Sequence, residues 1–504
     1  MANSKKSLKN NSQPNCRGLK NKVPKGTLQK RDLAATAKVQ DPLLLQLNTF
    51  LSACLSSGLG QDLNFDLNTD LNTDLNPRPQ LLLGLSGGLD SCVLLHLLVA
   101  SQQTSSFNLQ AMHVHHGLSA NADAWAEFCA QQCALLNVPL QIVHVNVDKN
   151  TKLGIEAAAR QLRYEALFNY MLNVENTLDV QPDFIVTAHH QDDQAETLLL
   201  QLFRGAGVKG LASMAAVDKS RRLLRPLLDV SRNVLQDYAV QHHIQWCDDE
   251  SNTNTQYERN FVRHEVMPIL ETRYPAVKAV LARTASHLAE ANDLLDTLAA
   301  IDAEHLLLDN SLCLQGLSLL DLARAKNVLR WWFAKNHLAM PSAEYLNEII
   351  YQLLNAKADA NINIALQHLT LKRFQQRVYL LQEQSTQDFD LVWNGEPELT
   401  LPNGGKLQFK QSTGAGLALK FGMTKLRITN RDGGERFKPN VLRPTRTLKH
   451  LLQEANIPPW QREYMPLIYW HDTLAFVPGI GIAHELQASE SEQGVEINWQ
   501  DASI

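Results

Sequence analysis

The hexapeptide SGGLDS at residues 86–91 contains the residue types of a phosphate-binding loop. An apolar run typical of a buried strand precedes it, and a run typical of a helix follows it at 92–98. Gly87 and Gly88 allow a ligand to approach the backbone closely, and the unpaired N–H groups at a helix start attract anions. No Gly-Lys-Ser/Thr follows, so the loop differs from the type that grips a transferred γ-phosphate. The spacing therefore predicts a loop that binds phosphate through its backbone and its hydroxyl groups.

A second group of chemically capable residues lies in AHHQDDQAETLLL at 188–200. His189, Asp193 and Glu196 are spaced four and three residues apart, which predicts that they share one face of a helix. Asp192 lies four residues before Glu196. Acidic residues in a first helical turn complement the helix dipole, and this is the structural explanation for them. Because that explanation does not require the two histidines, we favour a site that holds a cationic amine, accepts its proton or binds magnesium.

Three shorter segments contribute histidine and arginine candidates. HVHHGL ends a predicted strand with His115 and His116, and open α/β sheets bind ligands beyond the carboxyl ends of their strands. The helical run EAAARQLRYEAL places Arg160 and Arg163 on one face, where they suit phosphate groups or surface ion pairs. The glycine-rich segment LFRGAG adds Arg204. From spacing alone, the structural and functional interpretations of the histidine pair and of the helical arginines are equally supported.

The elements that must position these residues alternate between short apolar runs and helical patterns over 80–270. This alternation predicts the α/β fold class, with a doubly wound parallel sheet whose strands are buried on both faces. Residues 271–388 show mainly amphipathic helical patterns and predict a helical middle domain. Residues 389–504 predict a small α+β C-terminal domain. Ahead of the sheet we expect a disordered basic tail at 1–40 and a leading helix with an acidic Asp-Leu-Asn linker at 41–79.

The composition of the 504 residues excludes several classes of protein. With 47 basic and 52 acidic residues the net charge is −5, so binding to nucleic acid requires local patches. The segment 421–463 supplies one, because its nine basic and four acidic residues give a charge of +5. No apolar run reaches the roughly 18 residues of a membrane-spanning helix. Seven cysteines without a Cys-x-x-Cys pair argue against zinc and iron–sulfur sites and favour a reducing cytoplasm.

The loop and the segments after it resemble a known family. SGGLDS resembles the PP-loop of the N-type ATP pyrophosphatases, which cleave ATP between its α- and β-phosphates. The order of the motifs resembles the tRNA(Ile)-lysidine synthetase family: SGGLDS, HVHHGL, EAAARQLRYEAL, AHHQDDQAET, LFRGAG, RPLL and DESNTNTQYERNFVR. RDGGERFKPN at 431–440 and LKHLLQEANIPPWQREYMPLI at 448–468 resemble its C-terminal domain. The resemblance implies a PP-loop catalytic domain of the adenine nucleotide alpha hydrolase-like type at 80–270 and a tRNA-binding domain at 389–504.

The resemblance also implies a reaction. Lysine would be ligated to C2 of the wobble cytidine of the CAU-anticodon isoleucine tRNA, through an adenylated cytidine intermediate. The products would be lysidine, AMP and pyrophosphate, and codon reading would change from AUG to AUA. ATP is the expected co-substrate and Mg²⁺ the expected cofactor, with Asp90 as the metal-binding candidate. The expected partners are the isoleucine tRNA and L-lysine, and a homodimer is the assembly allowed for beside a monomer.

The resemblance assigns a role to each candidate residue. The implied catalytic residues are Asp90, Arg160, Asp192, Asp193, Glu196 and Arg204. The implied ATP-binding residues are Ser86, Gly87, Gly88, Leu89, Asp90, Ser91, His115 and His116. The implied lysine-binding residues are His189, Asp193 and Glu196. The implied tRNA-binding residues are Arg163, Arg259, Arg263, Arg431, Arg436, Lys438, Arg446, Lys449 and Arg462.

Three alternatives have a different function. A tRNA thiolation enzyme of the same PP-loop superfamily would generally carry cysteine pairs, and this chain has none. A small-molecule ligase, such as a GMP, NAD or argininosuccinate synthetase, would lack the basic C-terminal module. A non-catalytic tRNA-binding protein would have no reason to keep both the intact loop and the three carboxylates.

Overall fold

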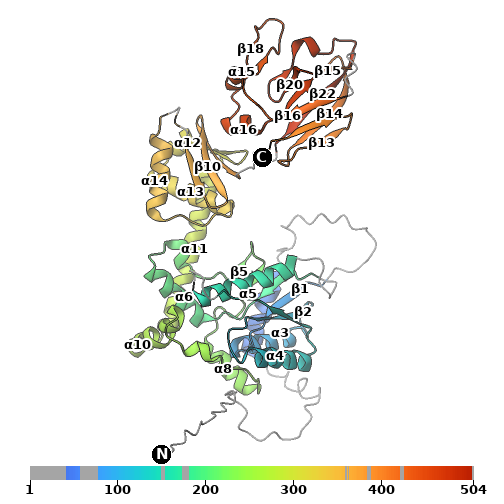
Figure 1. Ribbon diagram of the computed structural model, residues 1–504. Helices are drawn as coiled ribbons and strands as arrows, with labels where there is room; N and C mark the ends of the chain where they lie inside the picture. The colour runs from blue at the N-terminus through green and yellow to red at the C-terminus, as the bar shows by residue number, and fades with distance from the viewer. Residues whose placement is uncertain are drawn as a thin grey trace, which may run out of the picture. The chain divides into compact units, whose positions relative to one another are not determined.

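The computed structural model describes residues 41–56, 78–148, 154–172, 181–357, 360, 362–382, 388–419 and 425–501. The predicted tail at 1–40 and the Asp-Leu-Asn repeat at 62–76 lie outside these residues. The chain forms two compact units, Met1–Leu294 and Leu295–Ile504, and each is described by itself (Figure 1).

A six-stranded sheet organises the first unit. Its strands follow the order β3-β2-β1-β4-β6-β5, and every neighbouring pair is parallel except β5 with β6. The predicted α/β class with a doubly wound parallel sheet is thereby confirmed. The strands are β1 (Gln80–Gly84), β2 (Asn108–His115), β3 (Leu140–His144), β4 (Phe184–Val186), β5 (Val217–Asp218) and β6 (Leu223–Leu224).

Helices cover both faces of this sheet (Figure 1). Leu81 and Leu83 of β1 belong to a core shared with α2, α3, α4 and α8, whereas Leu82 belongs to a core shared with α5. The unbroken apolar run of β1 therefore has a simple cause, since successive side chains point to opposite and equally buried faces. The helices are α2 (Pro42–Ser56), α3 (Leu89–Ser101), α4 (Ala122–Leu136), α5 (Ile155–Leu172), α6 (Gln191–Phe203), α7 (Val208–Leu211) and α8 (Arg232–Gln241).

A series of helical segments follows the sheet. The chain passes through a 3₁₀ turn and then through a π-helical turn between two short α-helices. The segments are η1 (Glu250–Thr253), α9 (Glu258–Phe261), η2 (Val262–Val266), α10 (Met267–Arg273) and α11 (Val277–Ala303). π-helical turns are rare in proteins, and those that occur are often found at functional sites. This one carries Arg263.

The middle of the chain contains three helices, α12 (Leu314–Leu319), α13 (Leu322–Lys335) and α14 (Ala343–Asn355). Their apolar faces pack in one core with a sheet of order β7-β8-β11-β10-β9. The strands are β7 (Leu307–Leu308), β8 (Ser311–Cys313), β9 (Asn363–Leu366), β10 (Leu369–Phe374) and β11 (Arg377–Gln382). The predicted helices are present, but the purely helical description of 271–388 needs correction because it omits this antiparallel sheet.

The turns of the middle sheet explain why the sequence did not reveal it. Two-residue turns join β9 to β10 and β10 to β11, and such turns are usually marked by glycine, asparagine or aspartate. Here Gln367 and Gln375 take the positive φ values, +56° and +53°. Since glutamine is not a typical turn residue, the hairpins carry no recognisable turn signal.

The C-terminal part is built from antiparallel sheets around one apolar core. The first sheet has the order β12-β16-β19-β20-β21, the second β13-β14-β22-β15, and β17 pairs with β18. The strands are β12 (Asp390–Trp393), β13 (Glu398–Thr400), β14 (Lys406–Thr413), β15 (Leu417–Ala418), β16 (Leu426–Thr429), β17 (Arg436–Phe437), β18 (Arg446–Thr447), β19 (Leu467–Trp470), β20 (Thr473–Val477), β21 (Gly481–Ile482) and β22 (Gln493–Gln500). With α15 (Leu448–Glu454), α16 (Pro459–Tyr464) and η4 (His484–Leu486), this is the α+β architecture that was predicted.

Candidate active site

The candidate site lies where the direction of the sheet reverses. Strand β1 sits between β2 and β4, because the chain runs from β1 to β2 and β3 on one side and then crosses back to place β4 on the other side. Ligands of doubly wound sheets bind at this position, beyond the carboxyl ends of the strands. SGGLDS follows β1, and AHHQDD follows β4. The topology therefore brings the predicted phosphate loop and the predicted carboxylate cluster together.

The phosphate loop is held in a compact turn. Gly87 has φ +83°, and a Cβ on it would lie 3.1 Å from the Sγ of Cys129, so both conformation and space favour glycine. The hydroxyls of Ser86 and Ser91 lie 3.0 Å apart, and Ser91 donates to the carbonyl of Gly88. Helix α3 begins at Leu89, which is buried, directly after this turn. The loop thus offers backbone N–H groups and two hydroxyls at the start of a 13-residue helix.

His190 occupies the centre of the carboxylate cluster. Its Nε2 lies 3.6 Å from Asp90 and 3.5 Å from Asp193, and its Nδ1 lies 4.0 Å from Asp192. Burial alone would lower the pKa of His190, but the three carboxylates outweigh it and raise the pKa. The raised pKa favours the imidazolium form, which joins the phosphate loop electrostatically to the carboxylates after β4.

The residue spacing predicts His189 for the site and does not point to His190. The predicted helical face shared by His189, Asp193 and Glu196 is wrong, because α6 begins only at Gln191. His190 is instead the residue that precedes the helix, and its backbone N–H donates to Asp193. The motif carried a usable signal, since an acid three residues after His190 can reach back to its backbone N–H, as in a capping box.

His189 contacts Arg160 rather than a carboxylate. The guanidinium of Arg160 donates to its Nε2 over 3.2 Å, and its Nδ1 lies 2.9 Å from the hydroxyl of Thr187. Because a guanidinium can only donate, Nε2 is the acceptor and the proton of the neutral ring is on Nδ1. Burial lowers the pKa of His189 to about 3, in agreement with a neutral imidazole. His189 thus orients Arg160.

Two arginines neutralise the carboxylates of α6. Arg259 donates to Asp193 and Glu196 over 2.8 Å each, and Arg263 donates to Glu196 over 2.6 and 2.9 Å. Arg263 also reaches Asp193 over 3.3 Å. Burial opposes ionisation of Asp193, but His190 and the arginines outweigh it, so its pKa is held low. The structure joins Arg259 and Arg263, predicted as tRNA contacts, to the carboxylates predicted to bind lysine.

The remaining predicted residues of this unit lie in different surroundings. His115 contacts Asp123 over 3.0 Å. The ring nitrogens of His116 are buried without a hydrogen-bond partner in the described part of the chain, and burial lowers its pKa to about 4. Arg163 is exposed, and desolvation by the surrounding protein, with the neighbouring Arg160, lowers its pKa. Arg204 forms a largely exposed pair with Glu258.

The predicted tRNA-binding residues of the C-terminal unit differ in how far they are already paired. Arg431 is held by Glu435 over 3.1 Å, and Arg446 by Glu454. Arg462 donates to the carbonyl of Ile457. Arg436, Lys438 and Lys449 have no ion pair among the residues that the structure describes, and Arg436 and Lys449 are exposed. Arg436 and Lys449 are therefore the exposed cations of the predicted patch, and Lys438 is half-buried.

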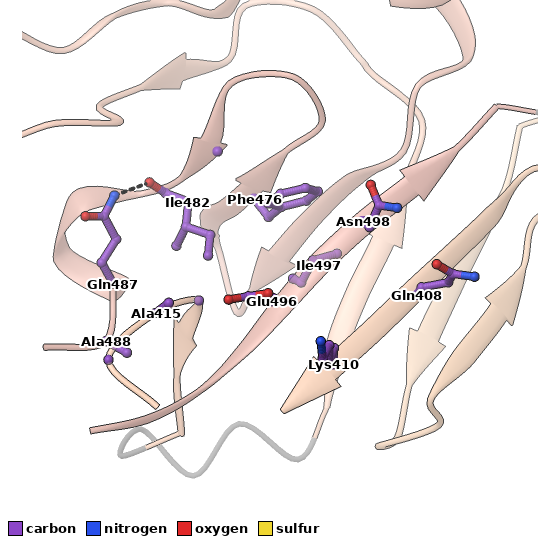
Figure 2. Close-up of a pocket in the computed structure, with 13 residues that line it drawn as sticks. Gln408, Lys410, Ala415, Phe476, Ile482, Gln487, Ala488, Glu496, Ile497 and Asn498 are labelled. Atoms are coloured by element: carbon purple, nitrogen blue, oxygen red, sulfur yellow. Dashed lines mark hydrogen bonds between the residues drawn. The ribbon is translucent and has the colours of Figure 1, made fainter. Parts of the chain in front are cut away.

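A groove of about 620 Å³ lies beside this patch in the same unit (Figure 2). Its floor is formed by β14 and β22, where Lys410 stands opposite Glu496. Gln487 at its rim donates to the carbonyls of Ile482 and Pro439, and so joins the groove to the basic segment. None of the predicted site residues lines it.

Family models and curated relatives cover most of the chain. Residues 63–270 match the PP-loop domain, residues 312–379 the TilS substrate binding domain, and residues 426–499 the TilS substrate C-terminal domain. A tRNA(Ile)-lysidine synthase from Nitrosomonas europaea is 40% identical over 85% of this chain and 93% of the relative. This chain belongs to the tRNA(Ile)-lysidine synthase family. Relatives of the same name from Serratia proteamaculans (40% identical; 84% of this chain, 95% of the relative) and Coxiella burnetii (38%; 83% and 92%) agree.

Solved structures add little to this family assignment. A U34-tRNA thiolase from Methanococcus maripaludis with its [4Fe-4S] cluster is 17% identical, with a TM-score of 0.38, over 49% of this chain and 78% of that chain. A TilS C-terminal domain is 20% identical, with a TM-score of 0.20, over 23% of this chain and 98% of that chain. Both scores are too low to support an argument, so the thiolation alternative gains nothing from them.

Asp90 is the residue of the candidate site that fits a metal ion. Its Oδ1 is buried and accepts no hydrogen bond within the described ranges, although Arg232 Nε lies 4.0 Å away. No cluster of three or more His, Cys, Asp or Glu side chains suited to a metal occurs in those ranges. One carboxylate fits Mg²⁺, which is usually held by one or two carboxylates together with substrate phosphates and water.

Among the described helices, none is long and apolar enough to span a membrane.

Proposed function

We propose that this protein ligates L-lysine to C2 of the wobble cytidine of the CAU-anticodon isoleucine tRNA, using ATP. The membership of the lysidine synthase family supports the overall reaction. The observation that carries the chemistry is the position of His190, which lies within 3.6 Å of both the loop carboxylate Asp90 and the helix carboxylate Asp193. Nucleotide and amine would meet at this point.

In the first step the C2 oxygen of cytidine attacks the α-phosphate of ATP, and pyrophosphate leaves. Ser86, Gly87, Gly88, Leu89, Asp90 and Ser91 form the proposed pyrophosphate cradle, with His115 and His116 on the side of β2. The backbone N–H groups at the start of α3 are already oriented, before the reaction begins, toward the position where negative charge develops on the leaving pyrophosphate. Arg160, held by His189, and Arg204 are proposed to balance phosphate charge. Mg²⁺ held by Asp90 would supply neutralisation of phosphate charge.

In the second step the ε-amine of lysine adds at C2 and AMP leaves. An amine with an ordinary pKa near 10.4 is almost fully protonated at neutral pH, so it must first give a proton to one of the carboxylates of the site. Asp193 and Glu196, with His189 nearby, form the proposed lysine subsite. Because Arg259 and Arg263 neutralise these carboxylates, the subsite offers charges of both signs. Such a cluster suits a zwitterionic amino acid better than a carboxylate pair alone would.

The tRNA is proposed to contact the basic residues of both units. Arg163 supplies a cation at the catalytic unit, and Arg436, Lys438 and Lys449 supply accessible cations in the C-terminal unit. Arg431, Arg446 and Arg462 complete the proposed C-terminal contact. The same proposal includes a cytoplasmic location and a homodimer. Light scattering of the purified protein measures the oligomeric state.

The test uses purified protein, ATP and radiolabelled lysine with the minor isoleucine tRNA, and a methionine tRNA as control. We expect AMP and pyrophosphate, and label in the isoleucine tRNA only. Asp90→Ala and Asp193→Ala are expected to abolish lysine incorporation while tRNA affinity stays within about twofold, because removing an acidic side chain takes away no cation that attracts the RNA. Formation of ADP and orthophosphate, or incorporation of sulfur into the tRNA, would overturn the proposal.

A further inference from the structure

Lys278 enters the candidate site from outside the motifs. It lies in the first turn of α11, and its ammonium group is 2.8 Å from Oδ2 of Asp192 and 3.0 Å from Oε1 of Glu271. Asp192 is only 8% exposed. Since a buried carboxylate requires compensation, Lys278 supplies the positive charge that allows Asp192 to remain ionised in the fold.

The second carboxylate oxygen of Asp192 also accepts a hydrogen bond from the protein. Its Oδ1 accepts the backbone N–H of Arg232, the first residue of α8, over 3.1 Å. The side chain of Arg232 in turn approaches Asp90, with Nε 4.0 Å from Oδ1. Asp192 thereby connects the first turn of α6 to the start of α8, and through α8 to the loop carboxylate.

We propose that Lys278 is a positioning residue that occupies Asp192 as a resident ammonium group, so that Asp192 fixes the start of α8 and does not receive the substrate amine. This inference rests on the proposed function and assigns different roles to the neighbouring acids. Asp193 and Glu196 remain the lysine subsite, and Asp192 serves the geometry around Asp90.

The charges around Asp192 agree with this division. His190 Nδ1 lies 4.0 Å away on the preceding turn, Arg232 is on α8, Lys278 on α11 and Glu271 on α10. Burial opposes the ionised form, but Lys278 and the N–H of Arg232 outweigh it, and the pKa of Asp192 is lowered. An incoming lysine would have to displace an ammonium group that two carboxylates hold.

Lys278→Met separates this proposal from its main alternative. If Lys278 positions Asp192, its loss should reduce kcat for lysine transfer at least tenfold while the KM for lysine stays within twofold. Lys278→Arg keeps the charge and should restore at least half of kcat. If Lys278 were only a placeholder that leaves when lysine binds, Lys278→Met would lower the KM for lysine and keep kcat, and the proposal would be wrong.

Asp192→Asn tests the same point from the other side, because asparagine retains an acceptor for the N–H of Arg232. We expect a reduced kcat with the KM for lysine within threefold, whereas a tenfold rise in KM would show that Asp192 holds the substrate. Glu271→Gln is the matched control, since it removes the other partner of Lys278, and kcat should stay within twofold.

A measurement without substrate keeps this inference separate from the proposed function. Urea unfolding of Lys278→Met, Asp192→Asn and the double variant forms a double-mutant cycle. We expect the double variant to lose clearly less stability than the sum of the single losses. Additive losses would contradict the pairing even if lysine is transferred, and wild-type protein that transfers no lysine would contradict the function while leaving the cycle to decide on the pairing.

Discussion

The guanidinium of Arg263 donates hydrogen bonds to both carboxylate oxygens of Glu196, with Nε 2.6 Å from Oε1 and Nη2 2.9 Å from Oε2. Glu196 is 3% exposed, so each of its oxygens needs a donor from the protein. The π-helical turn that contains Arg263 places the guanidinium within reach of α6. This bidentate pair is the tightest contact in the proposed lysine subsite.

Arg263→Lys should therefore damage lysine transfer although the charge is kept. A lysine ammonium cannot donate to both oxygens in one plane, so the bidentate pair would be lost and Oε2 of the buried carboxylate would keep only the bond from Arg259. We expect kcat/KM for lysine to fall at least tenfold, or about 1.4 kcal/mol, in an assay with saturating ATP and tRNA.

The control for Arg263→Lys is Arg427→Lys, which replaces an exposed arginine fork on Asp390 in the C-terminal unit. An exposed pair contributes little, so kcat/KM should stay within about twofold. Equal losses in both variants would mean that the geometry around Glu196 does not matter for lysine.

Gly87→Ala should impair the use of ATP. An alanine at φ +83° is strained, and its Cβ would meet the Sγ of Cys129 at 3.1 Å, so the loop must shift. We expect the KM for ATP to rise at least tenfold in pyrophosphate exchange. Gly154→Ala has a similar φ, +81°, with nothing within 4 Å of the added Cβ, and is expected to leave the KM for ATP within twofold.

Removal of the accessible cations of the C-terminal unit should weaken tRNA binding through electrostatics. Lys438→Gln with Lys449→Gln removes two positive charges. The plot of log K against log salt has a negative slope, and each phosphate that is no longer neutralised makes that slope less steep by about 0.7 to 0.9. We expect lower tRNA affinity at low salt and a flatter salt dependence in filter binding. Lys406→Gln is the control, because Lys406 already pairs with Glu398 outside the basic segment. An unchanged slope in the double variant would remove this surface from the proposed tRNA interface.

His96 predicts how the first unit responds to acid. Burial and the neighbouring His242 lower its pKa to about 4, and its Nδ1 lies 3.0 Å from the hydroxyl of Tyr238. Below its unfolded pKa of about 6.5, the unfolded chain binds a proton that the folded chain does not. The free energy of unfolding should therefore fall as the pH drops from about 6.5 to 4.

Hydrogen exchange of peptides from α3 and α8 checks the contribution of His96. Protection should decrease over this pH window in the wild type, after correction for intrinsic exchange, and His96→Asn should flatten the dependence. His287→Asn, at an exposed position of α11, should not change it. If both variants behave like the wild type, another group causes the acid response.

Much of this protein could be predicted from local sequence. The apolar run of β1, followed by two glycines and a helix, predicts a phosphate loop because the backbone around it has few other conformations. The alternation of strands and helices likewise predicted the parallel sheet, and the order of the motifs identified the family. These features depend on residues that are close together in the chain.

The pairings inside the site depended on distant segments. No spacing joins Arg259 and Arg263 to Asp193 and Glu196, or Lys278 to Asp192, since those contacts span more than sixty residues. The helix that begins at Gln191 rather than at His189 decided which histidine meets the carboxylates. Residue types and their order along the chain therefore specified the chemistry. The packing of α6 against α9, η2 and α11 decided which charge neutralises which, because Coulomb energy depends on distance in space and not on separation in sequence.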